Sequence, residues 1–332
     1  MNPGLPSTLR AAVDQLCLGV SGRLLAERAE ELSAVYRSGG GSKSALPDHA
    51  GRLAYLTTRM PATFAAVSAA LAAVSERLGG FAPASLLDLG AGPGTAAWAA
   101  AELLPALADI TLVEALPAFR DLARTLAGAS AVPALARAVI RDGRLPECAG
   151  DLRPAGLVIA SYLFGELPKP HVAAAIDAAW QATTGVLLLV EPGTPRGYHL
   201  ILAARARLIA AGAEPVAPCP SAAACPIIAP DWCHFSVRLP RLKAHMQAKA
   251  ADLPYEDEKF AYLAVRRPGG KLPDLQRILS APVIAKHEAR LRLCGPGGLT
   301  EVTLPSREKT PFQAARKAGW GGTWPDEAKS PE

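Results

Sequence analysis

The sequence lacks the features that mark secreted and membrane-spanning proteins. It has no run of about 18 uncharged apolar residues, so we expect no transmembrane helix. Its first residues lack a basic stretch followed by an apolar one, which predicts no secretion signal and a cytoplasmic protein. Cysteine is also scarce, with six in 332 residues. In a chain that is not secreted, this number does not indicate a disulfide framework.

Positive charge is unevenly distributed along the chain. Residues 235–332 hold 17 Lys or Arg and 11 Asp or Glu, whereas residues 1–234 hold 18 and 19. The net charge of +5 therefore comes from the C-terminal part. This asymmetry indicates an anionic partner such as RNA, although an ordinary solvated basic face gives the same count. We expect neither a membrane nor a DNA partner.

Helical and strand-like patterns divide the chain into three parts. Residues 1–80 are expected to form an N-terminal helical region. Residues 81–215 alternate short apolar runs with helical periods, which predicts a doubly wound, parallel α/β sheet. Residues 216–332 hold the basic excess and three clustered cysteines, and are expected to form a C-terminal extension that contains a metal cluster.

The N-terminal region is interpreted as a helical lid or cap. Residues 5–36 have the pattern of one or two amphipathic helices. A Gly/Ser-rich segment, 37–51, predicts a flexible joint. Two further helices are expected over 52–78, separated at Pro61, because proline removes a backbone donor.

A glycine-rich loop follows the first strand of the α/β region. In "LLDLGAGPGT", Asp88 lies near the end of the strand, and Gly90, Gly92 and Gly94 precede a helix. The glycines permit a tight turn and a close approach of the backbone to a ligand at the helix N-terminus. The loop lacks the longer spacing of a dinucleotide fingerprint and the Lys-Ser/Thr of a phosphate-binding loop. It resembles motif I of class I S-adenosylmethionine-dependent methyltransferases, which have a Rossmann-like fold.

Two acidic residues follow at the ends of the next strands. Glu114 ends the second strand, 20 residues after Gly94, where an acidic side chain accepts hydrogen bonds from ribose hydroxyls. Asp142 ends the third strand, where the same methyltransferases often contact the adenine. Together with the glycine loop, these residues predict a binding site for S-adenosylmethionine. A pocket that no longer binds the cofactor is the alternative.

The fourth strand does not end in a recognisable reactive motif. Amine methyltransferases have an Asn/Asp-Pro-Pro-Tyr-like motif there, and pyrimidine carbon methyltransferases use a cysteine; "SYLFGELP" contains neither. Ser161, Tyr162 and Glu166 could face a substrate, but a capping or packing role explains them equally well. The sequence therefore leaves open whether the protein transfers methyl groups.

Three cysteines lie within one short stretch, "APCPSAAACPIIAPDWCHF". They are Cys219, Cys225 and Cys233, and Cys294 in "RLCGPGG" is a candidate fourth ligand. Four thiolates bind either zinc or an iron–sulfur cluster. The wide, irregular spacing favours a 4Fe–4S cluster, because structural zinc sites prefer paired, closely spaced cysteines. His234 keeps a mixed zinc site as the alternative, whereas Cys17 and Cys148 receive no role.

Several segments together resemble one family: the methyltransferase-like proteins of the ribosomal small subunit, known from mitochondria and with bacterial relatives. The resemblance extends from about residue 50 to 325. The segments that carry it include "RMPATFAAV", "LLDLGAGPGT", "SYLFGELP", "DWCHFSVRLPR", "LPYEDEKFAYLAVRR" and "RKAGWGGTWP". It implies a class I methyltransferase fold, association with the small subunit and its rRNA during assembly, and a 4Fe–4S cluster on Cys219, Cys225, Cys233 and Cys294.

Two hypotheses about function follow from the resemblance. The protein is either an S-adenosylmethionine-dependent rRNA methyltransferase or a non-catalytic assembly factor that binds rRNA through a cluster-stabilised platform. Candidate phosphate contacts are Arg238, Arg241, Lys243, Arg266 and Arg267. Trp320 and Trp324 are candidates for stacking on unpaired bases.

Overall fold

A computed structural model describes residues 4–37, 48–241 and 255–325 of the chain. No helix within these ranges is long and apolar enough to cross a lipid bilayer. Most of the expected joint at 37–51, and the candidate RNA contact Lys243, lie outside the described residues.

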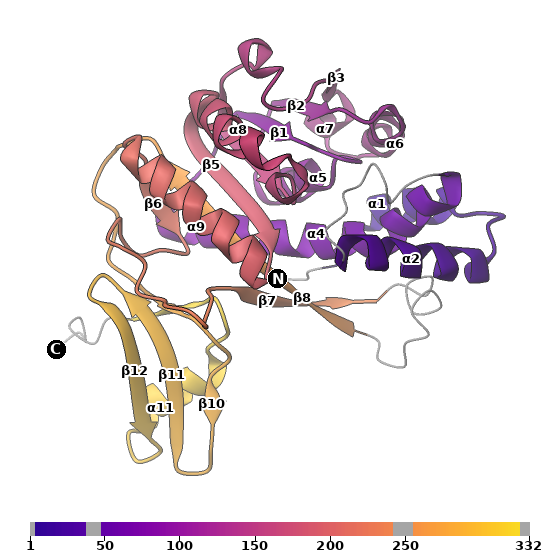
Figure 1. Ribbon diagram of the computed structural model, residues 1–332. Coiled ribbons are helices and arrows are strands. Elements are labelled where there is room, and N and C mark those ends of the chain that lie inside the picture. The colour runs from indigo at the N-terminus through magenta and orange to yellow at the C-terminus, as the bar shows by residue number, and fades with distance from the viewer. Residues whose placement is uncertain (1–3, 38–47, 242–254, 326–332) are drawn as a thin grey trace.

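The larger of two sheets forms the centre of the molecule. Its eight strands are β1 (Ser85–Leu89), β2 (Asp109–Glu114), β3 (Val139–Asp142), β4 (Ala155–Ser161), β5 (Thr183–Pro192), β6 (Glu214–Ala217), β7 (Phe235–Pro240) and β8 (Tyr255–Arg266). They follow the order β3-β2-β1-β4-β5-β8-β6, and β7 also pairs with β8 (Figure 1). The neighbours from β3 to β5 are parallel, whereas β8 is antiparallel to β5, β6 and β7. The predicted doubly wound α/β sheet is confirmed, with an antiparallel edge added.

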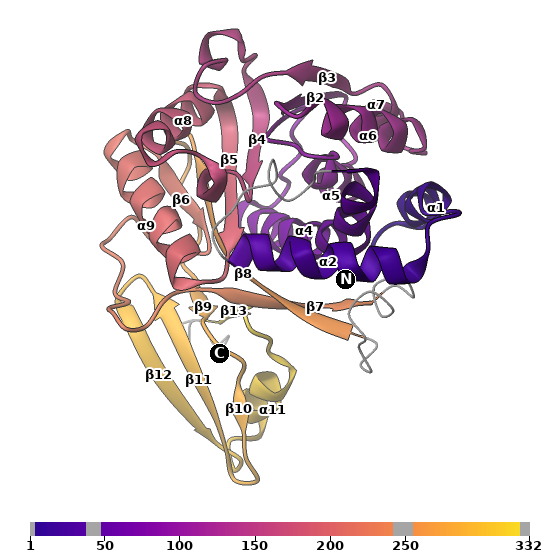
Figure 2. The same ribbon diagram turned by 45° about the vertical axis from the view of Figure 1, so that its right-hand side comes forward.

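Helices cover both faces of this sheet. They are α1 (Ser7–Leu16), α2 (Gly22–Arg37), α4 (His49–Leu78), α5 (Thr95–Leu103), α6 (Pro117–Gly128), α7 (Pro133–Ala136), α8 (Lys169–Gln181) and α9 (Pro195–Ala210), with two short 3₁₀ turns, η1 (Ala149–Asp151) and η2 (Phe164–Glu166). Figure 2 shows α8 and α9 on one face of the sheet and α4 and α5 on the other.

Alternation along the strands produces two separate hydrophobic cores. Leu86 packs with α4 and α5, whereas its neighbour Leu87 packs with α8 and α9. Because successive side chains of a strand point to opposite faces, a continuous run of apolar residues serves both layers. This explains why the strands of the α/β region are uniformly apolar.

Pro61 does not separate two helices, contrary to the prediction. α4 runs unbroken from His49 to Leu78, with Pro61 inside it and fully buried. The helix contacts α2, α5 and the strands β5 to β8, and these tertiary contacts offset the loss of one backbone hydrogen bond. Thr57 and Thr58 donate their hydroxyls to carbonyls one turn earlier. The predicted lid is therefore, in this part, a layer of the core.

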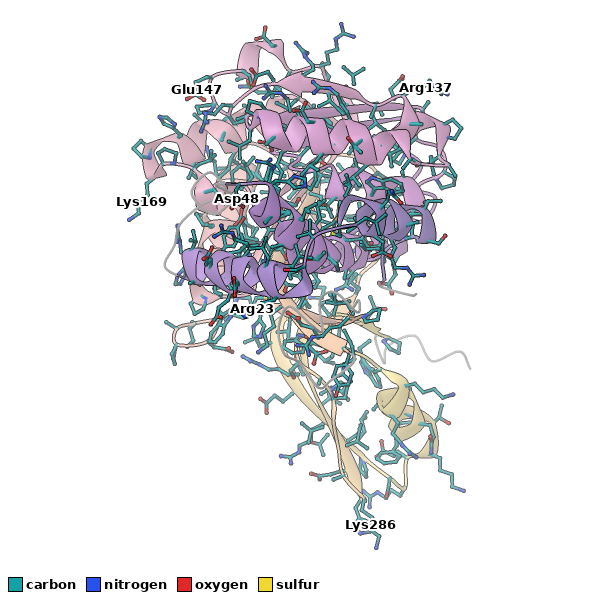
Figure 3. The ribbon with its side chains drawn as sticks, turned by 90° about the vertical axis from the view of Figure 1, so that its right-hand side faces the viewer. Arg23, Asp48, Arg137, Glu147, Lys169 and Lys286 are labelled. Carbon is teal, nitrogen blue, oxygen red and sulfur yellow. The ribbon has the colours of Figure 1, made fainter. Side chains whose placement is uncertain are left out.

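A second, smaller sheet follows the first. Its five strands are β9 (Gln276–Ile278), β10 (Val283–Ile284), β11 (Glu288–Gly295), β12 (Gly298–Pro305) and β13 (Thr323–Trp324), and helix α11 (Lys309–Lys317) packs against β11 and β12. It has its own core, which includes Phe312 and Trp324. The sheet projects from the α/β body, and Lys286 lies at its far tip (Figure 3).

The chain between the two sheets belongs largely to the first one. β6, β7 and β8 complete the larger sheet as far as Arg266. The predicted boundary between residues 215 and 216 therefore falls within that sheet. The loop that carries Cys219, Cys225 and Cys233 connects β6 to β7, whereas Cys294 lies on β11 of the second sheet.

Candidate functional site: glycine loop and cysteine cavity

The glycine loop connects β1 to α5 in a conformation that favours glycine. Gly90, Gly92 and Gly94 all have positive φ angles, of 66°, 55° and 85°. A Cβ atom on Gly90 would lie 2.6 Å from a methyl group of Leu163, at the end of β4. The loop thus has both the backbone geometry and the close approach that the sequence predicts for a binding turn.

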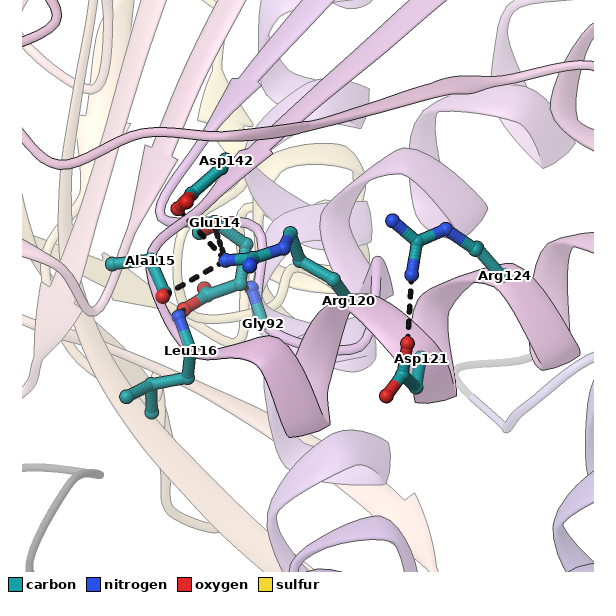
Figure 4. A network of polar contacts seen from close by, with 8 residues as sticks. All are labelled: Gly92, Glu114, Ala115, Leu116, Arg120, Asp121, Arg124 and Asp142. Carbon is teal, nitrogen blue, oxygen red and sulfur yellow. Dashed lines mark hydrogen bonds and ion pairs between the residues drawn. The ribbon is translucent and has the colours of Figure 1, made fainter.

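Glu114 holds this loop from the end of β2. Its carboxylate accepts hydrogen bonds from the backbone N–H of Gly92 at 2.8 Å and of Leu116 at 2.7 Å (Figure 4). Burial raises the pKa of Glu114, and the backbone donors oppose that rise. Glu114, the residue predicted to bind the ribose, therefore lies against the glycine loop. Its two hydrogen bonds hold the side chain in one orientation.

Asp142 lies nearby at the end of β3. It accepts a hydrogen bond from Nη1 of Arg120 at 2.8 Å, and the same nitrogen donates to the carbonyls of Glu114 and Ala115 (Figure 4). The Asp142 side chain is largely exposed. Arg120 thus connects the two predicted acidic positions, a role that the sequence reasoning missed.

Asp88 is the least satisfied polar group of the loop. Its side chain is fully buried, and in the part of the chain that the structure describes no donor meets hydrogen-bond geometry at either carboxylate oxygen, although the Ala97 backbone amide lies close enough to favour the charged form. Burial raises its pKa from 3.8 to about 8, with the Ala97 backbone amide opposing the rise. Thr95 also has a buried hydroxyl without a partner there. Burying a polar group without a hydrogen-bond partner costs free energy of folding. Asp88 and Thr95 therefore have hydrogen bonds to offer to a ligand.

The residues after β4 form a polar cluster with α4 and β8. Tyr162 has a φ of 56°, which is rare for a residue with a side chain, and its hydroxyl donates to Glu258 at 3.0 Å. Arg59 lies 4.0 Å from the same carboxylate. Of the three predicted candidates, Tyr162 therefore faces two charged residues that the sequence analysis did not select. Glu258 belongs to "LPYEDEKF", one of the segments specific to the resembled family.

Glu191, at the end of β5, fixes the turn after β4. It is buried and accepts a hydrogen bond from the backbone N–H of Phe164 at 2.8 Å. Burial raises its pKa from 4.5 to about 8. The sequence reasoning missed this residue too, although a glutamate directly after an apolar strand, as in "LLLVEPG", is the same signal that identified Glu114.

The four predicted cysteines line one cavity. Its volume is about 60 Å³, and Cys219, Cys225, Cys233 and Cys294 all contribute to its wall. Three come from the β6–β7 loop and the fourth from β11, so the cavity lies where the two sheets meet. Cys17 and Cys148 are not among its lining residues. All four predicted ligands thus lie on the wall of the same cavity, and metal binding by them stays a prediction.

Burial and mutual charge disfavour the thiolate form of Cys219, Cys233 and Cys294. Burial raises the pKa of Cys233 well above its usual value and that of Cys294 to about 11. The pKa of Cys219 is raised by burial as well, but Arg205 opposes the rise, because its Nε donates to the Cys219 Sγ at 3.3 Å. The hydroxyl of Tyr198 lies 3.4 Å from the Cys225 Sγ.

The cysteines are not drawn together as ligands of a single ion. Over residues 4–37, 48–241 and 255–325, no group of three or more His, Cys, Asp or Glu side chains is arranged to hold a metal ion. His234 is also directed elsewhere. Its ring stacks on Trp232, contacts the edge of Trp320, and lies with Nδ1 3.2 Å from the Trp232 carbonyl.

Most candidate RNA contacts of the sequence analysis are occupied within the protein. Arg238 pairs with Asp257, Arg241 with Glu256, and Arg266 with Glu214. Arg267 donates to two carbonyls and covers the ring of Trp180. Trp324 is buried in the core of the second sheet, and Trp320 donates to the His234 carbonyl. These contacts occupy the six residues to different degrees, with Arg238 still 62% exposed, and RNA contact at any of them stays a prediction.

Comparison with known proteins gives two kinds of match. The profile of a family described as mitochondrial small ribosomal subunit Rsm22 matches residues 49–325. The human mitochondrial ribosome assembly protein METTL17 is 26% identical over 294 residues, which are 82% of this chain and 62% of that protein. The chain thus spans less than two thirds of the length of this relative.

Solved structures of methyltransferases also align with the α/β part. Magnesium protoporphyrin IX methyltransferase from Synechocystis PCC 6803 with bound SAM is 15% identical, with a TM-score of 0.40 over 62% of this chain and 80% of that one. Precorrin-6y C5,15-methyltransferase from Geobacter metallireducens GS-15 is 17% identical, with a TM-score of 0.39 over 60% of this chain and 86% of that one.

Proposed function

The chain belongs to the mitochondrial small ribosomal subunit Rsm22 family, and on that premise we propose that it is an S-adenosylmethionine-binding, methyltransferase-like protein that acts in assembly of the small ribosomal subunit. The match over residues 49–325 carries the proposal, because it includes both the glycine loop and all four cavity cysteines. The human relative, named as a ribosome assembly protein, supports the same role.

The residues of the glycine loop fit S-adenosylmethionine. Asp88 offers buried carboxylate oxygens, Glu114, the expected ribose contact, lies beside Gly92, and Asp142, the expected adenine contact, is exposed. When bound, the cofactor supplies an electrophilic methyl group. The protein's own contribution is to hold it between the loop and the ends of β2 and β3.

A second candidate function is that of a non-catalytic assembly factor. The observation that favours it is the pairing of Tyr162 with Glu258, at the position where methyltransferases present reactive groups to a substrate. Both side chains are engaged with each other, and "SYLFGELP" contains neither a Pro-Pro nor a cysteine. In this case, cofactor binding would brace the fold without methyl transfer.

The proposal includes a 4Fe–4S cluster in the cysteine cavity. Its support is the placement of all four cysteines around one space, with hydrogen-bonding groups of Arg205 and Tyr198 at the sulfur atoms. When bound, the cluster would be held by Cys219, Cys225, Cys233 and Cys294, and would join the two sheets. The alternative is zinc on the same thiolates.

The second sheet offers basic side chains for rRNA. Five lie exposed on its tip, on α11 and on the chain leading into α11: Lys286, Arg307, Lys309, Arg316 and Lys317. We propose these, in place of the ion-paired arginines of the first sheet, as contacts with the phosphate backbone. Such contacts fix position without reading sequence.

Removal of the gene and isothermal titration together test the proposal. Cells without the protein should accumulate unassembled small subunits, and the purified protein should bind S-adenosylmethionine. Mass mapping of small-subunit rRNA then separates the two functions, because one methyl group missing in the deletion strain identifies an enzyme. Normal small subunits in the deletion strain would refute a role in assembly.

A further inference from the structure

Three buried arginines contact the cavity wall or the chain segments next to it: Arg205 lines the cavity, Arg77 donates to the carbonyl of the lining residue Pro220, and Arg277 lies opposite Cys294 in the strand pairing. Arg77, Arg205 and Arg277 are 5%, 7% and 1% exposed, respectively. They come from three separate elements, α4, α9 and β9. Fully buried arginines are rare unless paired with an acidic group, so three of them near one loop need an explanation.

Arg205 is fully committed to the loop that carries the cysteines. Besides its contact with the Cys219 sulfur, its Nη2 donates to the carbonyls of Ser221 at 2.8 Å and Ala223 at 2.7 Å. The guanidinium therefore fixes the loop and places its charge directly at a candidate ligand atom. None of these acceptors carries a negative charge while the cysteine is a thiol.

Arg77 and Arg277 use only a fraction of their donors. Arg77 donates from Nη2 to the Pro220 carbonyl at 3.1 Å, and Arg277 donates from Nη1 to the Gly321 carbonyl at 2.8 Å. Among the described residues, Nε and Nη1 of Arg77, and Nε and Nη2 of Arg277, have no partner. The acidic group paired with Arg277 is Glu76, at 3.4 Å, which is about half exposed.

These charges act on one another and on the cysteines. After burial, the positive charge of Arg277 is the next cause of the lowered pKa of Arg77. Arg277 also lies opposite Cys294 in the pairing of β9 with β11. A negative charge in the cavity would thus relieve a repulsion already built into the fold.

We propose that Arg77, Arg205 and Arg277 are a countercharge shell for an anionic iron–sulfur cluster held by the four cysteines, an inference that rests on the cluster proposed above. Four thiolates around the cluster carry a net negative charge, which this shell compensates. Hydrogen bonds to sulfur and nearby positive charge also favour the reduced, more negative level of a cluster. The three arginines are therefore positioning residues that set cluster retention and reduction potential.

The test compares matched arginine variants of the full-length protein, purified without oxygen. Arg205→Met and Arg277→Met remove a charge, and Arg205→Lys keeps it. Arg207→Met is the control, because Arg207 lies on the same helix but pairs with Asp177 at the surface. The measurements are iron per chain, the rate of iron release to a chelator, and the midpoint potential of one-electron reduction by dithionite.

We expect the two charge-removing variants to release iron about tenfold faster than wild type, as loss of an outer-shell partner typically does. Their midpoint potential should also fall, whereas Arg205→Lys and Arg207→Met should stay close to wild type. The sign of the shift is informative, because greater solvent exposure after a structural loss would stabilise the more negative, reduced level and raise the potential. Thermal unfolding of each variant identifies any that fail to fold. If Arg205→Met does not fold, the comparison of charge-removing variants rests on Arg277→Met.

The outcomes separate the shell from the cluster itself. Wild-type protein without iron would refute the cluster, and the shell with it. Wild-type protein with iron, together with charge-removing variants that keep its release rate and its potential, would refute the shell alone.

Discussion

The glycine loop and the cysteine cavity are built in opposite ways. The loop is local: a strand, a turn and a helix within residues 85–103, closed by Glu114 from the next strand. The cavity is non-local, because it joins a loop of the first sheet to Cys294 on the second and is also lined by Arg205 of α9. The comparison teaches that a local site is specified by backbone conformation, and a non-local one by the packing of whole domains.

The two sites should therefore fail in different ways. A change in the glycine loop should affect one ligand and leave the rest of the protein intact. A change in the cavity should affect the contact between the sheets, because metal binding and folding are coupled when the ligands are far apart in sequence. The following predictions test this contrast.

The largest effect is expected from Cys294→Ser. A serine hydroxyl is far less acidic than a thiol and is a poor cluster ligand, so anaerobically purified protein should lose most of its iron and its brown colour. The second sheet should also become more sensitive to proteolysis. Iron content and limited proteolysis measure both effects.

The control for this experiment is Cys148→Ser, because Cys148 lies outside the cavity. It should change neither iron content nor protease sensitivity. Equal iron in the Cys294→Ser protein and the wild type would contradict the four-cysteine ligand set. One zinc and no iron in the anaerobic wild type would replace the cluster with a zinc site.

Gly92→Asp should remove cofactor binding without affecting the second sheet. The variant forces a side chain into a backbone with φ of 55° and adds a carboxylate beside Glu114. We expect the binding free energy of S-adenosylmethionine to become less favourable by about 3 kcal/mol, which lowers the affinity roughly 100-fold. Titration calorimetry measures the affinity, and Gly128→Asp, on an exposed helix end with open space, is the control.

Iron content should be unchanged in Gly92→Asp if the two sites are independent. A loss of iron in this variant would show that the local site and the non-local site are coupled. Wild-type protein that gives no heat with S-adenosylmethionine would contradict the cofactor pocket itself.

Asp88 should make the protein less stable as the pH rises. Its folded-state pKa, about 8, is above its ordinary value of 3.8, so the unfolded chain releases this proton at a lower pH than the folded protein. Stability should therefore fall between about pH 4 and pH 8. Asp88→Asn should reduce the slope of the unfolding free energy against pH by about 1 kcal/mol per pH unit over this range. Urea unfolding at several pH values measures it.

The exposed Asp109→Asn should leave this pH dependence as in the wild type. Glu191, whose pKa is also raised by burial to about 8, contributes a second slope of the same sign. The prediction fails if Asp88→Asn and the wild type have parallel pH profiles.

The smallest effect is expected at the basic face of the second sheet. Replacing Lys309 and Lys317 by Glu should reduce the salt dependence of RNA binding, by about 0.7 in the slope of log K against log salt per lost contact. Arg266→Gln should leave the slope unchanged, because Arg266 is already paired with Glu214. Filter binding over a range of salt concentrations measures the slope. If Arg266→Gln reduces the slope and the lysine replacements do not, the RNA contact lies on the first sheet instead.

The local elements were the most predictable from sequence. α6 occupies Pro117–Gly128 within the region of predicted alternating strands and helices, because a proline opens it and its apolar residues recur at helical spacing. Glu114 was identified in the same way, as an acidic residue after an apolar strand. Its bond to the Gly92 backbone could not be predicted, because that bond depends on where two separate turns meet.

The non-local elements were not predictable in this way. β9, β10 and β13 are two or three residues long and exist through pairing with distant strands, so they leave no periodic pattern. The ion pairs of Arg238 and Arg266 likewise depend on strand pairing, and a count of charges cannot show them. The cysteines were found by a different signal, since three of a rare residue within 15 positions is informative without any geometry.

The separation of Cys294 from the other three cysteines has a consequence for the order of events during synthesis. About sixty residues separate Cys233 from Cys294. At typical elongation rates, the nascent chain exposes three thiols for roughly 3 to 12 seconds before the fourth is made. During that interval β8 is translated and can close the first sheet, whereas the cavity still lacks a wall. The order of translation would therefore delay insertion of the proposed cluster until the α/β body is folded.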